Sequence, residues 1–382
     1  MSTTTPAPST AQPAQDHDQH QDQHQDGVQH PPRPDHLKLS DHPLFRRFWY
    51  AVAFTADVEG APVRRRVLGT DVVVWRAEEG RPVSAALDRC AHRDAPLSKG
   101  WVENCHLVCP YHGWEWDRDG HTQRIPQFPA SPHPTKSGLT MVRSAEKYGM
   151  AWVCLATDAE GGPAHDLPVV PELDDPTHDG LTWRAVPETT WSFDCSAMHL
   201  TENNLDPGHV AFVHAGSFGN KDEPELTDTV VDRTPDGMVA RGEVPVAARP
   251  GEEGATVRIS TSTLVLPFFL HLEIRYPDGL RHVMIKAITP EDDERSYLLQ
   301  TVLRTDTEAD RPAAEILAFD EIVEDEDRDL LESLPKEYPL APHLNAHAHA
   351  DRNSLALRRL WSDLVTGRFT VPAATDDPAG EA

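Results

Sequence analysis

Short runs of apolar and β-branched residues, separated by glycine, proline or aspartate, recur between residues 42 and 160. Residues 72–75, 83–87 and 151–155 are such runs. Runs of this composition, bounded by turn residues, are typical of β-strands. The pattern therefore predicts an all-β domain in this part of the chain.

A different pattern follows the segment at residues 158–177, which is rich in proline, glycine and aspartate. Residues 256–304 predict three or four longer strands at hairpin spacing, and residues 196–216 predict a broken helix. Two further helices are predicted at residues 312–334 and 352–366. Because strands and helices are grouped rather than alternating, we expect an α+β domain with an antiparallel sheet.

The two ends of the chain have little to bury. Residues 1–37 consist largely of Gln, Asp, His, Pro, Ser and Thr, a composition that predicts disorder. We therefore expect a disordered tail at residues 1–37, a first domain at 42–160, a second domain at 161–370 and a flexible tail at 371–382.

The chain has 62 acidic and 35 basic side chains, and its formal net charge is −27. Binding to nucleic acid or anionic lipid requires a basic surface, so neither is expected. No apolar run approaches the ~20 residues that a membrane-spanning helix needs, and the N-terminus lacks the basic and apolar regions of a signal peptide. We expect a soluble, cytoplasmic protein.

Two loops each contain one cysteine and one histidine, Cys90 with His92 and Cys109 with His112. Two thiolates and two imidazoles suit a structural zinc ion, although zinc ligands usually come as a pair of cysteines and a pair of histidines. In a Rieske [2Fe-2S] cluster one iron takes both thiolates and the other both imidazoles, which fits the split between the loops. The chain has only five cysteines, and this odd, sparse set favours metal ligation over disulfides.

A second group of polar residues comprises Asn203, Asp206, His209 and His214. A step of five residues turns about 140° around an ideal helix, so the two histidines do not share a helical face. The proline and glycine that precede His209 would break the helix and could let the imidazoles converge. Taken alone, two unrelated histidines on a loop explain this pattern as well as a metal site does.

In this order the two motifs resemble those of bacterial Rieske non-haem iron ring-hydroxylating oxygenases. The resemblance rests on C-A-H-R-D-A-P-L from Cys90, on C-P-Y-H-G-W from Cys109 and on the group from Asn203 to His214, and it covers about residues 42–340. It implies an N-terminal all-β Rieske domain followed by a helix-grip, START-like catalytic domain. The chain length resembles that of stand-alone, homotrimeric O-demethylases and related monooxygenases.

The resemblance also implies roles for individual residues. It implies that the Rieske [2Fe-2S] cluster is bound by Cys90, His92, Cys109 and His112. It further implies that His209, His214 and one carboxylate bind a mononuclear Fe(II). Asp206, with Asn203 nearby, would serve catalysis by bridging His209 to a Rieske histidine of the neighbouring subunit, namely His112.

The carboxylate ligand has to be chosen among nine acidic residues between 312 and 334. On a helical wheel Asp327 lies about 20° from the centre of the apolar stripe, and Asp320 is the only other acid comparably placed. Glu326 and the other neighbours of Asp327 point away from that stripe. The acid-rich segment followed by leucines also resembles the family's third-ligand context, so we choose Asp327. The alternative is an interior salt bridge from Asp327 to an arginine of the last helix.

The function implied is that of a terminal oxygenase that activates O2 to hydroxylate, dihydroxylate or dealkylate a small organic, cyclic or aromatic substrate. The chain has no flavin or nicotinamide motif, so electrons from NAD(P)H would arrive through a separate ferredoxin, flavin reductase or both. The alternative is a non-oxygenase, either a Rieske electron-transfer protein or a zinc-stabilised binding protein. Neither the substrate nor the reaction subtype follows from the sequence.

Overall fold

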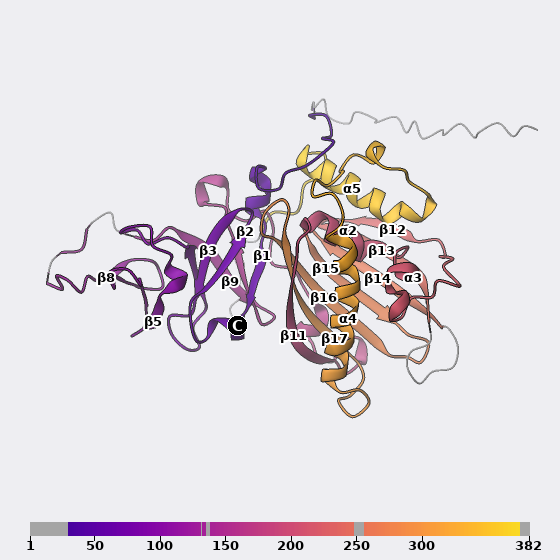
Figure 1. Cartoon of the computed structure of the whole chain (residues 1–382), viewed down its shortest axis with the longest axis horizontal. Coiled ribbons are helices and arrows are strands. Elements are labelled where there is room, and N and C mark those ends of the chain that lie inside the picture. The colour runs from indigo at the N-terminus through magenta and orange to yellow at the C-terminus, as the bar shows by residue number, and fades with distance from the viewer. Residues whose placement is uncertain (1–29, 131, 135–137, 248–255, 375–382) are drawn as a thin grey trace, which may run out of the picture.

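The computed structural model of the chain describes residues 30–130, 132–134, 138–247 and 256–374. Two parts lie next to each other along the longest axis (Figure 1). The N-terminal part is built from strands, and the C-terminal part combines one large sheet with helices.

The described residues of the N-terminal part form two sheets, in which all paired strands are antiparallel. The first sheet has the order β1-β10-β9-β4-β3-β2, and the small sheet has the order β5-β6-β7-β8. The bounds of these strands are β1 Tyr50–Phe54, β2 Val63–Val67, β3 Thr70–Trp75, β4 Ser84–Leu87, β5 Trp101–Glu103, β6 His106–Val108, β7 Glu115–Trp116, β8 Thr122–Arg124, β9 Met141–Lys147 and β10 Met150–Cys154.

The large sheet of the C-terminal part is antiparallel throughout and has the order β11-β17-β16-β15-β14-β13-β12. The bounds of its strands are β11 Arg184–Phe193, β12 Val230–Thr234, β13 Gly237–Val246, β14 Thr256–Val265, β15 Phe269–Arg275, β16 Arg281–Pro290 and β17 Ser296–Arg304.

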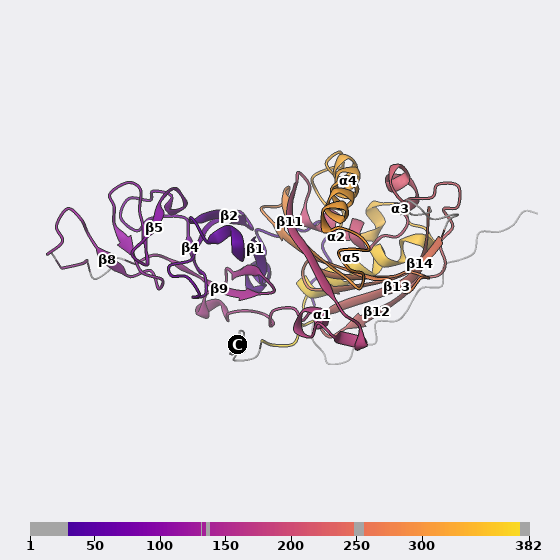
Figure 2. The ribbon, with the colours of Figure 1, turned by 90° about the horizontal axis from the view of Figure 1, so that it is seen from below.

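Helices α2, α3 and α4 lie on the same face of the large sheet (Figure 2). The bounds of the α-helices are α1 Pro171–Asp174, α2 Ala197–Leu205, α3 Val210–Val213, α4 Ala313–Leu331 and α5 Arg352–Val365. The 3-10 helices are η1 Pro43–Arg47, η2 Thr55–Val58, η3 Leu97–Lys99, η4 Asp158–Glu160, η5 His178–Gly180, η6 His214–Gly216, η7 Pro342–Leu344 and η8 His349–Asp351. None of the helices that the described residues form is both long and apolar enough to cross a membrane.

The side chains of β16 alternate between two partners. Val283 and Ile285 belong to a buried cluster that also contains Trp152 of the N-terminal part. Met284, between them, packs with Ile316 of α4. Since successive side chains of a strand point to opposite faces, β16 is covered on both sides and the two parts of the chain share a core.

Helix α4 buries a column of acidic residues against the sheet. Its buried positions recur every three or four residues, which places them on one helical face. They are Ile316, Asp320, Glu324, Asp327 and Leu331. Carboxylates are rarely buried unless they are paired or bound to a cation, so this face of α4 indicates a polar site within the fold.

The predicted fold class is confirmed, with a β-rich Rieske-type part followed by a sheet with helices. The helix predicted at 312–334 is α4, Ala313–Leu331, and the strands predicted at 256–304 are four in number, β14 to β17. The sequence reasoning missed β11, β12 and β13, because their polar residues and the intervening turns obscured the alternating pattern.

The predicted N-terminal tail is wrong in its last part. Residues 1–29 lie outside the described residues, but residues 30–37 contact the C-terminal part. The guanidinium of Arg33 donates to Asp363 of α5 at 2.7 Å, and His30 Nδ1 lies 3.1 Å from the carbonyl oxygen of Thr366. Composition alone could not reveal this contact, because its partners are more than 300 positions away.

Candidate metal centres

The two Cys-His loops have the same backbone hydrogen bonds. In the first, Cys90 N–H donates to the carbonyl of Ala95, and Asp94 N–H donates to the carbonyl of Cys90. In the second, Cys109 and Gly113 make the equivalent bonds at the equivalent spacing. Asp94 and Gly113 both have positive φ, 55° and 65°, a conformation that favours Gly and Asp or Asn. The loops are therefore two copies of one turn, although their histidines stand at different offsets.

The donor atoms of these loops fit a Rieske cluster. Cys90 and Cys109 are each 1% exposed, and a hydrogen bond from the Cys90 thiol lowers the pKa of Cys109 to about 6. The imidazoles of His92 and His112 lie 4.6 Å apart between ring centroids. Both Nδ1 atoms are buried and lack a hydrogen-bond partner, which is unusual for a polar atom unless a ligand satisfies it. Two adjacent thiols and two adjacent unpartnered imidazole nitrogens match the two irons of such a cluster.

Aromatic side chains, one buried and one exposed, lie beside the histidines of these loops. The ring of Trp114 stacks on His92 at 4.4 Å between centroids, and Tyr111 lies beside His112 at 3.9 Å. Tyr111 is 65% exposed. The histidines thus lie at the surface of the N-terminal part, near the small sheet.

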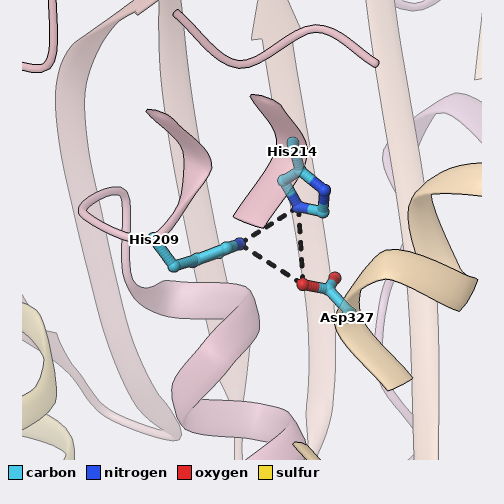
Figure 3. Close-up of side chains that lie close together, drawn as sticks. All are labelled: His209, His214 and Asp327. Carbon is cyan, nitrogen blue, oxygen red and sulfur yellow. Dashed lines mark hydrogen bonds and ion pairs between the residues drawn. The ribbon is translucent and has the colours of Figure 1, made fainter. Parts of the chain in front are cut away.

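A second cluster forms where α3 meets α4. Figure 3 shows the side chains of His209, His214 and Asp327 pointing toward one another. The two Nε2 atoms are 3.3 Å apart, and Asp327 Oδ1 lies 3.6 Å from His209 Nε2 and 3.4 Å from His214 Nε2. A point equidistant from three atoms so spaced lies about 2 Å from each, the length of a bond from a divalent transition metal to nitrogen or oxygen. These three residues fit a 2-His-1-carboxylate metal site.

The helix break between Asp206 and His209 is what lets the histidines converge. α2 ends at Leu205, and α3 begins at Val210, so His209 precedes the first turn of α3 and His214 follows its last. Gly219 allows the chain to double back here, because a Cβ on it would lie 2.2 Å from the carbonyl oxygen of Val210. Both imidazoles consequently face α4.

Hydrogen bonding and burial keep both imidazoles ready to bind metal. His214 Nδ1 lies 2.9 Å from Glu326 Oε2, and Ser217 Oγ donates to the same oxygen. A proton held on Nδ1 leaves the Nε2 lone pair free for a metal. Burial lowers the pKa of His209, which favours its neutral form. Asp327 Oδ1 is buried without a hydrogen-bond partner, as expected for an atom whose partner is a cation.

The prediction that Glu326 points away from the site is wrong. A helical wheel places side chains by angle alone, but the long Glu326 side chain reaches around α4 to His214. Asp320 is buried as expected and accepts a hydrogen bond from Gln300 Nε2 at 3.3 Å. Glu324 was missed, although it is 2% exposed and pairs with Lys286 at 2.6 Å. Its spacing of four from Asp320 could have revealed it.

The salt bridge considered for Asp327 is not observed within the described residues. The buried arginine of the last helix, Arg358, pairs with Glu202 at 3.0 Å. Asp206 lies at the C-terminus of α2, with one carboxylate oxygen 3.8 Å from His209 Nδ1 and the other accepting from Gly208 N–H at 2.8 Å. Its side chain is 29% exposed, so it lies between His209 and the surface.

A cavity opens beside the triad, with an empty volume of about 850 Å³ that includes open solvent at its mouth. His209, His214 and Asp327 line it together with polar residues of α2, β14, β16 and β17. Asn203 lines it too, and its side-chain amide nitrogen is buried without a hydrogen-bond partner. A small organic molecule in this cavity would lie next to the metal site.

Replacing Asp327 with asparagine is expected to deplete the mononuclear iron, because a neutral amide cannot supply the anionic ligand. Asp320→Asn is the matched control, since Asp320 lies two turns away on the same face of α4 and contacts Gln300 instead. The two variants are compared by their iron content per chain, measured by mass spectrometry, and by the visible spectrum of the cluster. Depletion in the Asp320 variant and not in the Asp327 variant would show that the wrong carboxylate was chosen.

Two family models match the chain. The Rieske [2Fe-2S] domain matches residues 48–143, and the vanillate O-demethylase oxygenase C-terminal domain matches residues 193–367. The chain is 28% identical over 337 residues to the methylxanthine N1-demethylase NdmA of Pseudomonas putida, an alignment that covers 84% of this chain and 89% of that protein.

Solved structures are similar to this chain as well. NdmA from Pseudomonas putida superposes with a TM-score of 0.69 at 27% identity, covering 84% of this chain and 90% of that one. Dicamba monooxygenase bound to dicamba superposes with a TM-score of 0.71 over 85% and 98% of the two chains, and at 21% identity this supports the fold alone.

The chain belongs to the Rieske terminal oxygenases, in which a Rieske domain precedes an oxygenase domain. It is therefore an oxygenase that uses a Rieske [2Fe-2S] cluster and a mononuclear iron to oxidise a small, typically aromatic substrate with O2. The alternative of a non-oxygenase electron-transfer or zinc-stabilised binding protein is set aside. The individual ligands remain predictions that the geometry fits.

Proposed function

We propose that this chain catalyses oxidative demethylation, removing a methyl group from nitrogen or oxygen of a small cyclic molecule. The reaction class is supported by relatives named as demethylases, among them the methylxanthine N1-demethylase that aligns with most of the chain. The observation that carries the oxygenase assignment is the buried convergence of His209, His214 and Asp327. Their three ligand atoms lie within 4.8 Å of one another beside a cavity.

We assign Cys90, His92, Cys109 and His112 as the cluster ligands and His209, His214 and Asp327 as the ligands of the mononuclear iron. When bound, the cluster supplies single electrons and the iron activates O2. Glu326 holds the Nδ1 proton of His214, so that Nε2 stays available. Asn203 lines the cavity and has a side-chain amide nitrogen without a hydrogen-bond partner, so that it can donate to the substrate or to oxygen-derived groups.

Electron delivery between subunits of a head-to-tail homotrimer is part of the proposal. The small sheet lies next to the Cys-His loops, and α3 lies next to the iron triad. These two elements are at opposite ends of the molecule in both views (Figures 1 and 2). Such a separation disfavours transfer within one chain. The partly exposed carboxylate of Asp206 could instead accept a hydrogen bond from His112 of a neighbouring subunit, whose ring lies at the surface of its own domain.

The remaining assignments are also proposals. The domain division is 42–160 and 161–370, which encloses both family matches. The electron donor is a separate ferredoxin, flavin reductase or both, fed by NAD(P)H, and the enzyme is cytoplasmic.

Asp206→Asn is expected to spare both metal centres while stopping electron delivery between them. The amide keeps the size of the carboxylate but removes the charge that orients the two imidazoles. Rapid-mixing measurements should find the cluster reduced at the normal rate and its reoxidation by O2 and substrate slowed at least about 100-fold. Normal reoxidation would remove Asp206 from the electron path.

Hybrid trimers separate transfer between subunits from transfer within one. Mixing a Cys109→Ser variant with an Asp206→Asn variant brings an intact cluster next to an intact Asp206 at some interfaces. Partial recovery of activity is therefore expected, with hybrid formation verified by native mass spectrometry. No recovery in verified hybrids would favour transfer within a single chain.

A further inference from the structure

A second chamber continues the cavity at the iron triad. It has an empty volume of about 790 Å³, open solvent included. The two share the lining residues Phe218, Arg258, Ile274, Met284, Asp320 and Val323. Because six residues line both, the two spaces adjoin. We treat them as one elongated space and call the part away from the triad the distal chamber.

The strand register gives the length of this space. Lys286 pairs with Gln300 and lines the cavity at the triad, while His282 pairs with Arg304 and lines the distal chamber. The two pairs are four residues apart on β16, about 13 Å at the usual rise of a strand. On α4, Ile316 lines the distal chamber and Asp327 the triad, about 16 Å apart along the helix axis. The space therefore suits an elongated molecule.

The distal chamber is positively charged. Arg258, Arg304 and Arg311 line it together with His282. Arg304 pairs with Asp306. Arg258 and Arg311 lie over aromatic rings, 4.6 Å from the centroid of Phe218 and 5.7 Å from that of Phe319, and within the described residues neither has a carboxylate partner.

Two buried nitrogen atoms of the chamber lack a hydrogen-bond partner. Arg258 Nε is buried without a hydrogen bond, and so is Nε2 of His282, a residue only 7% exposed. Buried polar atoms are normally satisfied. These two atoms, which come from separate strands of the sheet, therefore indicate a ligand that accepts hydrogen bonds.

The carboxylate of Asp320, which lines the chamber, does not fully neutralise the positive charge of the arginines. Asp320 stands where the two spaces join, and burial together with the Glu324 carboxylate raises the pKa of Asp320 to about 7. A substantial fraction of Asp320 is therefore uncharged at neutral pH. Burial and the positive charges of Arg304 and Arg258 lower the pKa of His282 well below its usual value, so its imidazole is neutral and can donate one N–H.

We infer that the substrate is elongated and carries an oxyanion, a carboxylate or sulfonate, that binds Arg258, Arg311 and His282 in the distal chamber. Its opposite end then lies at His209, His214 and Asp327, where it is oxidised. The inference rests on the proposed function, which it extends by naming a substrate class. Charged hydrogen bonds from guanidinium groups would fix which end of the molecule faces the iron.

The test compares matched probes by titration calorimetry on the anaerobic, iron-loaded enzyme. The probes are 4-phenylbutanoate, 4-phenylbutane-1-sulfonate and the uncharged 4-phenylbutanamide. At least one anion is expected to bind about ten-fold more tightly than the amide. Which anion binds more tightly identifies the group that the chamber prefers.

Single substitutions test which residues cause the preference for the anion. Arg258→Gln and Arg311→Gln should each bring the affinities for anion and amide within about three-fold of each other, whereas Arg258→Lys should keep part of the preference. Arg275→Gln is the matched control, because Arg275 lies on the neighbouring strand but pairs with Glu273 and does not line the chamber. An unchanged circular dichroism spectrum verifies that each variant is folded.

Equal binding of anions and amide by the wild type, or a preference that survives both glutamine variants, would overturn the inference. The proposed function would then still stand, because iron content and O2-dependent product formation test it separately. A His209→Ala variant that keeps the anion preference but loses oxygenation would support both.

Discussion

Cys109→Ser is expected to abolish the visible absorption of the Rieske cluster and all oxygenation. A serine hydroxyl is rarely ionised near neutral pH and is a poor ligand for iron, whereas the Cys109 thiol is buried beside Cys90 with its pKa lowered to about 6. Loss of one of two thiolates leaves one iron without its ligand set. Absorption and electron paramagnetic resonance spectra of the purified, dithionite-reduced protein measure the result.

Cys105→Ser is the matched control for this experiment. Cys105 lies between the two loops in sequence, but it is exposed, and it should keep the full cluster signal. A Cys109 variant with an undiminished signal would rule out the assignment of this loop. A Cys105 variant without a signal would also contradict it, because the cluster would then depend on a residue outside the proposed set.

His209→Ala is expected to leave the cluster reducible while lowering product formation to below about a few percent of wild type. The two centres lie in different parts of the chain, so loss of an imidazole at α3 leaves both Cys-His loops intact. Without His209 Nε2, two ligand atoms remain from the three that lie within 4.8 Å of one another. Mononuclear iron content and product formation in the presence of the reduced electron donor are the measurements.

His349→Ala provides the comparison for His209. His349 lies at the surface, where it pairs with Asp228, and its loss should change neither iron content nor turnover. Substantial turnover by the His209 variant, with iron retained, would require a different ligand set. Because both variants keep the Rieske domain, their cluster spectra also give the fraction of each preparation that contains the cluster.

The arrangement around His214 explains why several acids gather on α4. Asp327 faces both imidazoles, and Glu326, the preceding residue, reaches His214 on its other nitrogen. One helical turn before Asp327, Glu324 is neutralised by Lys286, and a further turn back Asp320 contacts Gln300. The buried face of α4 thus serves both the metal site and the polar wall of the cavity, and this dual role accounts for its unusual composition.

The sequence alone determined the features that depend on short spacings. The Cys-His loops could be identified because their four donors lie on two tight turns, so that the local sequence carries nearly all of the geometry. The strands at 256–304 and the helices at 312–334 and 352–366 followed from hydrophobic periodicity, which survives in any tertiary context that buries one face. Asp327 followed from the same periodicity together with the resemblance to the family.

Tertiary structure decided what depends on partners far apart in the chain. Whether His209 and His214 converge depends on how tightly the segment after α3 folds back and on where α4 lies. Glu326 reaches His214 across 112 positions, and Glu324 meets Lys286 across 38. The distal chamber is formed by arginines from β14, β17 and the segment before α4, which are unremarkable in the sequence. Their charges matter only once the fold brings them to one chamber, because the interaction between charges depends on distance in space and on burial.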